Sequence, residues 1–228
     1  MNGMDELVSL WDETSKETAR THYDSVNGTV KVAIVGAGFT GLSAAIHCSE
    51  EGMLCHVIEA EHVGYGGSGR NTGLVNAGAW LPPQDIIKQL GEDAGRKFVG
   101  IFSEAPSFVF GLIEKYNIEC EAINTGTIHA AHSKSGLANL KYRKSEWDRL
   151  DAPVDLLSAD ETAELTGTRR FHGALVDNRA GTINPMGYCR GLARAALQNG
   201  VKITTGCRVC NLVKEILMKQ TVGIKGLG

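Results

Sequence analysis

The stretch VAIVGAGFTGLSAAIHCSEEGMLCHVIE, residues 32–59, decides the fold of this chain. It opens within the apolar segment Lys31–Val35, whose β-branched residues are typical of a parallel strand buried on both faces. Three glycines at G-x-G-x-x-G spacing follow, and then a run of small residues predicts a helix that starts near Thr40. A second apolar strand ends at an acid, Glu59. Strand, glycines, helix, strand and acid in this order predict a dinucleotide-binding unit.

Each glycine has a physical role in such a unit. Gly36 allows the tight turn out of the strand, Gly38 lets the backbone approach a pyrophosphate, and Gly41 lets the helix pack closely on the sheet. The N-terminus of the helix can bind the phosphates through unpaired N–H groups and its positive dipole end. Glu59 is expected to accept hydrogen bonds from the adenosine ribose, and its charge disfavours the 2′-phosphate of NADP. NAD and FAD both remain possible here, as does a plain strand–helix turn without a ligand.

A second glycine-rich segment, GYGGSGRNTGLVNAG at residues 64–78, holds six glycines in fifteen residues. Glycine weakens both helices and strands, so this density predicts a loop whose backbone closely approaches another group. Ser68, Arg70 and Asn71 add a hydroxyl, a positive fork and an amide, a set suited to a diphosphate and a polar ring edge. A flexible surface loop is the alternative, and Arg70 and Asn71 could equally hold the loop closed through backbone hydrogen bonds.

Together, GAGFTGLSAA, the distal Glu59 and GGSGRNTG resemble the flavin-dependent amine and amino-acid oxidoreductases of the D-amino-acid oxidase superfamily, most of all their γ-glutamylputrescine oxidoreductase branch. The resemblance implies bound FAD, with its ADP half on the glycines and Glu59 and its riboflavin side near residues 68–73. It also implies a main-chain contact from Val209 to adenine. Thr72 stands where the family motif commonly has a glycine. The candidate cofactor-binding residues are Gly36, Gly38, Phe39, Thr40, Gly41, Glu59, Ala60, Ser68, Gly69, Arg70, Asn71, Gly73 and Val209.

The expected fold is α/β: a Rossmann-like FAD-binding domain of the glutathione-reductase type with an inserted, incomplete α+β substrate domain. The expected divisions are a polar leader at residues 1–29, the first part of the FAD-binding domain at 30–117, a partial substrate domain at 118–181 and the second, incomplete part of the FAD-binding domain at 182–228. Trp11 and Tyr23 of the leader are expected to dock on the domain. Because family members continue beyond the point where this sequence stops, the chain is expected to be a fragment with reduced FAD affinity.

Local signals predict a helix and a strand near the C-terminal end of the sequence. Asn184 is suited to cap a helix, Pro185 to its first turn, and Gly200 to its end in a left-handed conformation. Val201–Thr204 then resembles the third strand of the family's FAD-binding domain.

The middle of the chain is expected to hold helices and strands of a second region. Apolar spacing across residues 84–117 predicts helices with one buried face, which Pro106 kinks or divides. Residues 121–133 and 171–180 are predicted strands, and between them residues 158–161 form a capping box for a short helix.

Composition limits the classes of protein to consider. With 228 residues, 43% hydrophobic residues and a net charge of −3, the chain is expected to be globular, without nucleic-acid binding. No apolar run reaches the length of a membrane span, and the polar start lacks the pattern of a signal peptide. A cytoplasmic protein with six reduced cysteines is therefore expected.

No metal site is expected from the cysteine and histidine spacings. Cys207 and Cys210 are expected at a strand end rather than at the start of a helix, and no second C-x-x-C is present. His129 and His132 are three apart on a predicted strand, where they would point to opposite faces.

The resemblance implies oxidation of a C–N bond in a small amine or amino-acid substrate: hydride passes to the flavin, and the imine formed is hydrolysed by water. Since this can proceed without a protein acid or base when the amine arrives neutral, no catalytic residue is nominated. A non-catalytic dinucleotide-binding fragment is the alternative, and an NAD-linked dehydrogenase is a weaker one because residues 64–78 would then lack a purpose. The specific substrate, the electron acceptor and the oligomeric state are left open.

Overall fold

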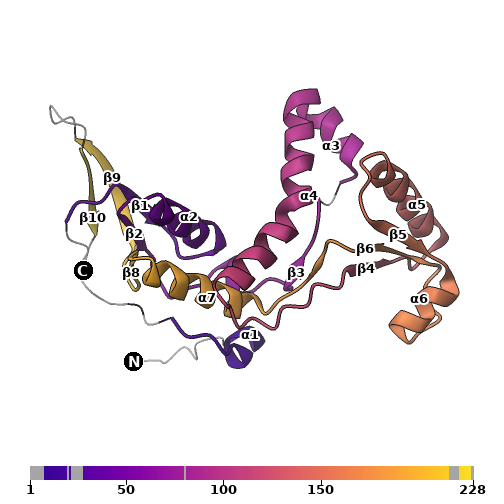
Figure 1. Cartoon of the computed structure of the whole chain (residues 1–228), viewed down its shortest axis with the longest axis horizontal. Coiled ribbons are helices and arrows are strands. Elements are labelled where there is room, and N and C mark those ends of the chain that lie inside the picture. The colour runs from indigo at the N-terminus through magenta and orange to yellow at the C-terminus, as the bar shows by residue number, and fades with distance from the viewer. Residues whose placement is uncertain (1–7, 20, 22–27, 80, 216–220, 227–228) are drawn as a thin grey trace. The chain divides into compact units, whose positions relative to one another are not determined.

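The computed structural model describes residues 8–19, 21, 28–79, 81–215 and 221–226 (Figure 1). The chain forms two compact units, each made of segments that are distant in sequence. Unit 1 comprises the chain up to Thr72, Ile113–Glu121 and the chain from Asn184 onward, and unit 2 comprises Gly73–Leu112 and Ala122–Ile183. The division into cofactor and substrate domains stays a prediction.

Unit 1 is built on a parallel three-stranded sheet in the order β1-β2-β8. Helix α2 (Phe39–Glu50) joins β1 (Val32–Val35) to β2 (Cys55–Ile58), and helix α7 (Pro185–Gln198) precedes β8 (Lys202–Thr204). All four residues of the central strand, β2, are buried. The predicted strand–helix–strand order of residues 31–59 is confirmed, and its order in the sheet is that of half a doubly wound fold.

The core of unit 1 is filled by side chains of α2, α7, β2 and β8. Leu42, Ile46, Val57, Leu192 and Ile203 are each at most 2% exposed. Each such side chain stabilises the fold by about 1.5–3 kcal/mol.

Helix α7 begins and ends at the predicted residues. The Asn184 side chain accepts a hydrogen bond of 2.9 Å from the Gly187 N–H, and Pro185 occupies the first helical position, where a missing N–H costs nothing. Gly200, with φ of +80°, turns the chain toward β8. These three predictions from the sequence are confirmed.

Four smaller elements of unit 1 lie among the described residues. Helix α1 (Leu10–Thr14) lies in the leader, and the short 3-10 helix η1 (Gly67–Gly69) lies in the second glycine-rich segment. Strand β9 (Val209–Glu215) pairs antiparallel with β10 (Thr221–Gly226).

Unit 2 holds an antiparallel sheet in the order β4-β6-β5, formed by Thr127–Ala130, Ala174–Asp177 and Val154–Leu157. Helix α5 (Lys134–Asp148) packs on this sheet, as Figure 1 shows. Helix α6 (Ala159–Thr166) begins at the predicted capping box. A short pair joins β3 (Leu74–Val75) to β7 (Gly181–Thr182). The predicted strands at 121–133 and 171–180 exist, but only over their middle residues.

The helices of residues 83–115 differ from the expectation in two ways. Helix α4 (Glu92–Lys115), which follows α3 (Pro83–Leu90), continues through Pro106, so the proline does not divide it. Proline has no N–H for the carbonyl four residues earlier, and that carbonyl, on Phe102, accepts a hydrogen bond of 2.9 Å from the Gly78 N–H. The apolar stripe is also only partly buried, since Ile101 is 57% exposed.

Among the described residues, no helix is long and apolar enough to span a bilayer. The cytoplasmic location stays a prediction.

Candidate cofactor site

The glycine turn, residues 36–41, connects β1 to α2. Gly36 has φ of +103°, which favours glycine. A Cβ on Gly41 would lie 2.1 Å from the carbonyl oxygen of Gly36 and 3.2 Å from Cγ2 of Ile34. Gly41 therefore allows the start of α2 to sit close against the end of β1, as the spacing predicted.

The N-terminus of α2 meets a hydroxyl from the second glycine-rich segment. The Phe39 N–H donates to Oγ of Ser68 at 3.1 Å, and a Cβ on Gly38 would lie 2.7 Å from the same oxygen. The Phe39 ring packs on Tyr188, with the ring centroids 5.2 Å apart. Thr40, the next helical residue, is exposed. Gly38, the N-cap residue, supplies no side-chain cap, so the first turn of the helix keeps the donor character that binds anions.

Glu59 stands directly after β2 and binds the glycine turn. Its Oε2 accepts a hydrogen bond of 2.8 Å from the Ala37 N–H, and its Oε1 accepts one of 3.0 Å from the Glu61 N–H. Glu59 and Ala60 are both half-buried. One carboxylate thus lies beside the first glycines of the motif, at the end of the central strand.

The glycine loop, residues 64–73, packs closely on α7. A Cβ on Gly69 would lie 2.3 Å from Cε of Met186, and a Cβ on Gly64 would lie 3.2 Å from Sγ of Cys189. A Cβ on Gly66 or on Gly67 would meet no atom within 4 Å. Close packing on α7 therefore explains part of the glycine density that the sequence attributed to approach to a ligand.

Asn71 and Arg70 have different surroundings. The amide of Asn71 donates to the carbonyl oxygens of Gly67 and Ser68, at 3.1 and 2.9 Å, and so closes the glycine loop on itself. Arg70 is exposed, and its Cζ lies 4.6 Å from the centroid of the Tyr65 ring. For the Asn71 side chain, the structure shows the loop-closing alternative. Arg70 projects from the same loop and does not close it in this way.

Thr72 does not need the left-handed conformation that would favour a glycine at its position. The described non-glycine residues with positive φ are Asn117, Glu121 and Asp151, so φ of Thr72 is not positive. Gly73 takes the left-handed one, with φ of +74°.

Val209 follows two residues whose backbone binds the acid-bearing segment, Glu59–Glu61. The Cys207 N–H donates to the carbonyl oxygen of Glu59 at 2.9 Å, and the Gly206 N–H donates to that of Glu61 at 2.9 Å. Val209 is the first residue of β9 and pairs with Gly226 across an irregular register.

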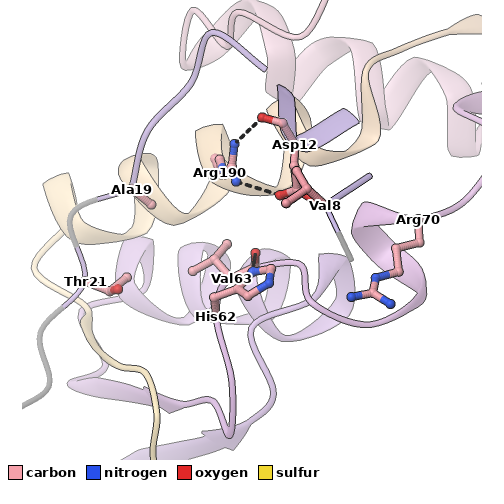
Figure 2. A pocket seen from close by; sticks show the side chains of 8 residues that line it. All are labelled: Val8, Asp12, Ala19, Thr21, His62, Val63, Arg70 and Arg190. Atoms are coloured by element: carbon pink, nitrogen blue, oxygen red, sulfur yellow. Dashed lines mark hydrogen bonds and ion pairs between the residues drawn. The ribbon is translucent and has the colours of Figure 1, made fainter. Parts of the chain in front are cut away.

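A hollow of about 420 Å³ opens between the glycine loop, α7 and the leader (Figure 2). Arg70 enters it from the loop and Arg190 from α7, where Nη2 of Arg190 lies 2.8 Å from Oδ1 of Asp12. Its lining residues are Val8, Asp12, Ala19, Thr21, His62, Val63, Arg70 and Arg190.

The leader contacts the rest of unit 1 through Trp11 and through two ion pairs that the sequence did not indicate. Trp11 donates from Nε1 to the Asn71 carbonyl oxygen at 2.9 Å, which confirms its expected docking. Tyr23 lies outside the described residues. The acids that anchor the leader, Asp12 and Glu17, were not predicted, because the arginines they meet on α7 are far away in the sequence.

His129 and His132 correct an expectation made from strand alternation. His132 lies beyond the end of β4, so alternation does not apply, and both histidines line one hollow of about 430 Å³ in unit 2. Burial and the neighbouring Arg143 lower the pKa of His129. In the described parts of the chain, no three His, Cys, Asp or Glu side chains are grouped as a metal site would require.

Comparison with known proteins identifies the sequence family and the fold. Residues 31–226 match the family model DAO, described as FAD dependent oxidoreductase. The γ-glutamylputrescine oxidoreductase of Escherichia coli is 33% identical over 186 residues, which are 79% of this chain and 43% of that protein. A probable oxidoreductase of Haemophilus influenzae is 31% identical over 199 residues, 81% of this chain and 43% of its own. The chain thus spans under half the length of these curated relatives.

Two solved structures illustrate the fold. The L-amino acid deaminase of Proteus myxofaciens has a TM-score of 0.71 at 21% identity, covering 89% of this chain and 44% of its own. The glycine oxidase of Geobacillus kaustophilus has a TM-score of 0.67 at 20% identity, covering 82% of this chain and 49% of its own. The α/β, Rossmann-like fold expected from the sequence is confirmed.

Proposed function

The chain belongs to the DAO family of FAD-dependent oxidoreductases, and from this premise we propose that unit 1 binds the FAD of an enzyme that oxidises a C–N bond in a small amine or amino acid. The family match identifies FAD as the cofactor. We infer the substrate class and the residues in contact with FAD.

The observation that best supports the cofactor site is the hydrogen bond from the Phe39 N–H to Ser68 Oγ. It joins the glycine turn and the glycine loop at one helix N-terminus, where phosphate groups are favoured by the helix dipole and by N–H donors. Ser68 can turn its hydroxyl to a phosphate, because a hydroxyl both donates and accepts. The residues present therefore fit a pyrophosphate.

The remaining contacts of the cofactor follow from the same arrangement. Glu59 would hold the adenosine ribose, with Ala60 and the main chain of Val209 beside the adenine, and the carboxylate of Glu59 would disfavour a 2′-phosphate. Arg70 and the backbone from Asn71 onward would lie toward the flavin. Since the amide of Asn71 already closes the loop, its role would be to fix the loop rather than to contact the ring.

The chemistry that bound FAD would supply is the acceptance of a hydride from the carbon next to the substrate nitrogen. Water would then hydrolyse the resulting imine to a carbonyl compound and an amine or ammonia. The protein would orient the substrate and exclude competing reactions. No described residue is assigned as a general acid or base, because a neutral amine needs none for this step. The substrate class rests on the names of the relatives, of which one is a γ-glutamylputrescine oxidoreductase.

Nucleotide titration of the purified chain tests the cofactor proposal. FAD, NAD and NADP are added separately, and binding is followed by flavin or protein fluorescence and by the shift of Tm that a bound ligand produces. FAD is expected to bind in preference to NAD, and NADP to bind worst. Preference for NAD would favour the dehydrogenase alternative, and no binding of any of the three would contradict the site.

The substrate class needs a separate measurement. The chain with bound FAD is mixed without oxygen with γ-glutamylputrescine, glycine and other small amines, and the visible absorption is recorded. Bleaching by an amine is expected. Bound flavin that no amine bleaches would support the non-catalytic alternative for this chain.

A further inference from the structure

The leader segment, residues 8–19, reaches the glycine loop through one side chain. Trp11 lies on α1, and its Nε1–H donates to the carbonyl oxygen of Asn71 at 2.9 Å. Trp11 is half-buried, so the indole is held against the domain rather than in open solvent. The short helix that carries it is stabilised by a capping box between Ser9 and Asp12.

Two carboxylates fix this segment to α7. Asp12, which follows Trp11 in the sequence, forms an ion pair with Arg190 at 2.8 Å. Glu17 is only 6% exposed; Nε of Arg194 donates to its Oε2 at 2.9 Å and Nη2 to its Oε1 at 2.6 Å. A two-pronged pair of arginine with a carboxylate fixes direction as well as distance. The backbone that carries Trp11 is therefore anchored on the helix that also packs against the glycine loop.

The contact continues from the leader into the proposed phosphate site. Trp11 holds the Asn71 carbonyl group, the Asn71 amide holds the carbonyl groups of Gly67 and Ser68, and the Ser68 hydroxyl accepts from the Phe39 N–H. Asn71 is thus held from the leader on one side, while it closes the loop on the other. Each link is a hydrogen bond between described residues.

We propose that Trp11 is a positioning residue for the cofactor: anchored through Asp12 and Glu17, it holds the glycine loop in the shape that receives FAD. This inference rests on the proposed function, because it takes the loop as the place where FAD binds. A preorganised loop loses less conformational freedom when the ligand arrives, so removal of the contact weakens binding even though Trp11 need not touch the cofactor.

Trp11→Phe tests the proposal because it keeps an aromatic ring and removes the N–H donor. Loss of one hydrogen bond predicts an FAD Kd that is about three- to tenfold higher in a fluorescence titration. In the cofactor-free chain, backbone amides of residues 67–73 are expected to exchange hydrogen faster than in the wild type. Glu13→Gln is the matched control, since Glu13 lies on the same helix and is exposed.

A second variant and a spectrum separate positioning from general stability. Asp12→Asn weakens the pair with Arg190 and is expected to change FAD binding and loop exchange in the same direction as Trp11→Phe. At saturating FAD, the visible circular dichroism of the bound flavin is expected to change in Trp11→Phe and to stay unchanged in Glu13→Gln. A uniform loss of stability would lower Tm without altering this spectrum.

Wild-type Kd and wild-type exchange of residues 67–73 in both Trp11→Phe and Asp12→Asn would overturn the inference. Failure of the proposed function looks different, because the wild type itself would then bind no FAD. The exchange measurement uses no FAD and still decides the loop-holding step in that case: faster exchange supports it, and unchanged exchange contradicts it.

Discussion

The carboxylate of Glu59 holds the Ala37 N–H, with Oε2 2.8 Å from that nitrogen. The acid at the end of β2 is therefore part of the glycine turn even before a ligand is considered. A ribose bound there would donate to the Glu59 carboxylate, which the Ala37 N–H already holds in place. Hydrogen bonds to charged groups contribute about 1.5–3 kcal/mol, more than those between neutral groups.

Glu59→Gln is accordingly expected to weaken FAD binding by about ten- to a hundredfold, as measured by titration of flavin fluorescence. Glu61→Gln is the matched control. Glu61 is exposed, and its pair with Arg208, at 3.3 Å, lies at the surface, where such pairs contribute little. Equal affinities in the two variants would mean that Glu59 does not contact the cofactor.

Gly41→Ala is expected to destabilise the fold. The added Cβ would lie 2.1 Å from the Gly36 carbonyl oxygen, and overpacking of this kind costs about 1–3 kcal/mol. Gly66→Ala places its Cβ in open space, at a residue with φ of −77°, and should change the free energy of unfolding by less than about 0.5 kcal/mol. Urea unfolding measures both; a Gly41→Ala variant as stable as Gly66→Ala would contradict the close approach of α2 to β1.

Glu17 is expected to make stability sensitive to acid. Burial alone would raise the pKa of Glu17, but the hydrogen bonds from Arg194 and from the Glu119 N–H outweigh it, so the pKa is lowered. A carboxyl group with a lowered pKa in the folded state stabilises the fold above its unfolded pKa, and this contribution is lost as the pH falls through the folded value. At neutral pH, Glu17→Gln removes the charge that the half-buried Arg194 binds and should cost about 1.5–3 kcal/mol.

Urea unfolding of wild type and Glu17→Gln from pH 7 to pH 3 measures this contribution. The difference in the free energy of unfolding should be largest at pH 7 and should shrink below a pH of about 4.5, where the unfolded chain begins to take up protons. A constant difference over the whole range would show that the stabilisation does not depend on the charge of Glu17.

His56 is expected to make the free energy of unfolding depend on pH in a higher range than Glu17 does. Its Nε2 lies 2.9 Å from Thr204 Oγ1 between β2 and β8, and burial, together with Lys202, lowers its pKa. Below a pH of about 6.5 the unfolded chain binds a proton at this histidine more readily than the folded chain does, so stability falls as the pH decreases. Between pH 7.5 and 5.5, the wild type should lose more unfolding free energy than His56→Gln, and parallel losses would contradict this.

Local chemistry explains which elements the sequence predicted. The strand of residues 32–35, the glycine turn and Glu59 lie within one short stretch, and their residue types restrict the backbone directly. The cap at Asn184 is equally local, since the side chain reaches the N–H three residues later. Such signals do not depend on the rest of the fold.

The contacts that were missed join residues far apart in the sequence. Arg190 and Arg194 lie one turn apart on α7, so the sequence could have placed them on one face of the helix. Nothing local indicates that this face meets Asp12 and Glu17. The continuation of α4 through Pro106 was also missed because it depends on a distant contact. The carbonyl group of Phe102, which the proline leaves without a helical partner, binds the N–H of Gly78 outside the helix.

The pairing of β2 with β8 also has a consequence for the order of folding. All of unit 2 lies between these strands along the chain, so their pairing must close a long loop, which is entropically costly and slow. The Glu59 N–H donates to the Thr204 carbonyl oxygen at 2.8 Å, so the acid is seated against β8. We expect the dinucleotide site to form last, after synthesis has passed Thr204. Until then, β1, α2 and β2 have one unpaired strand edge, which can lead to aggregation.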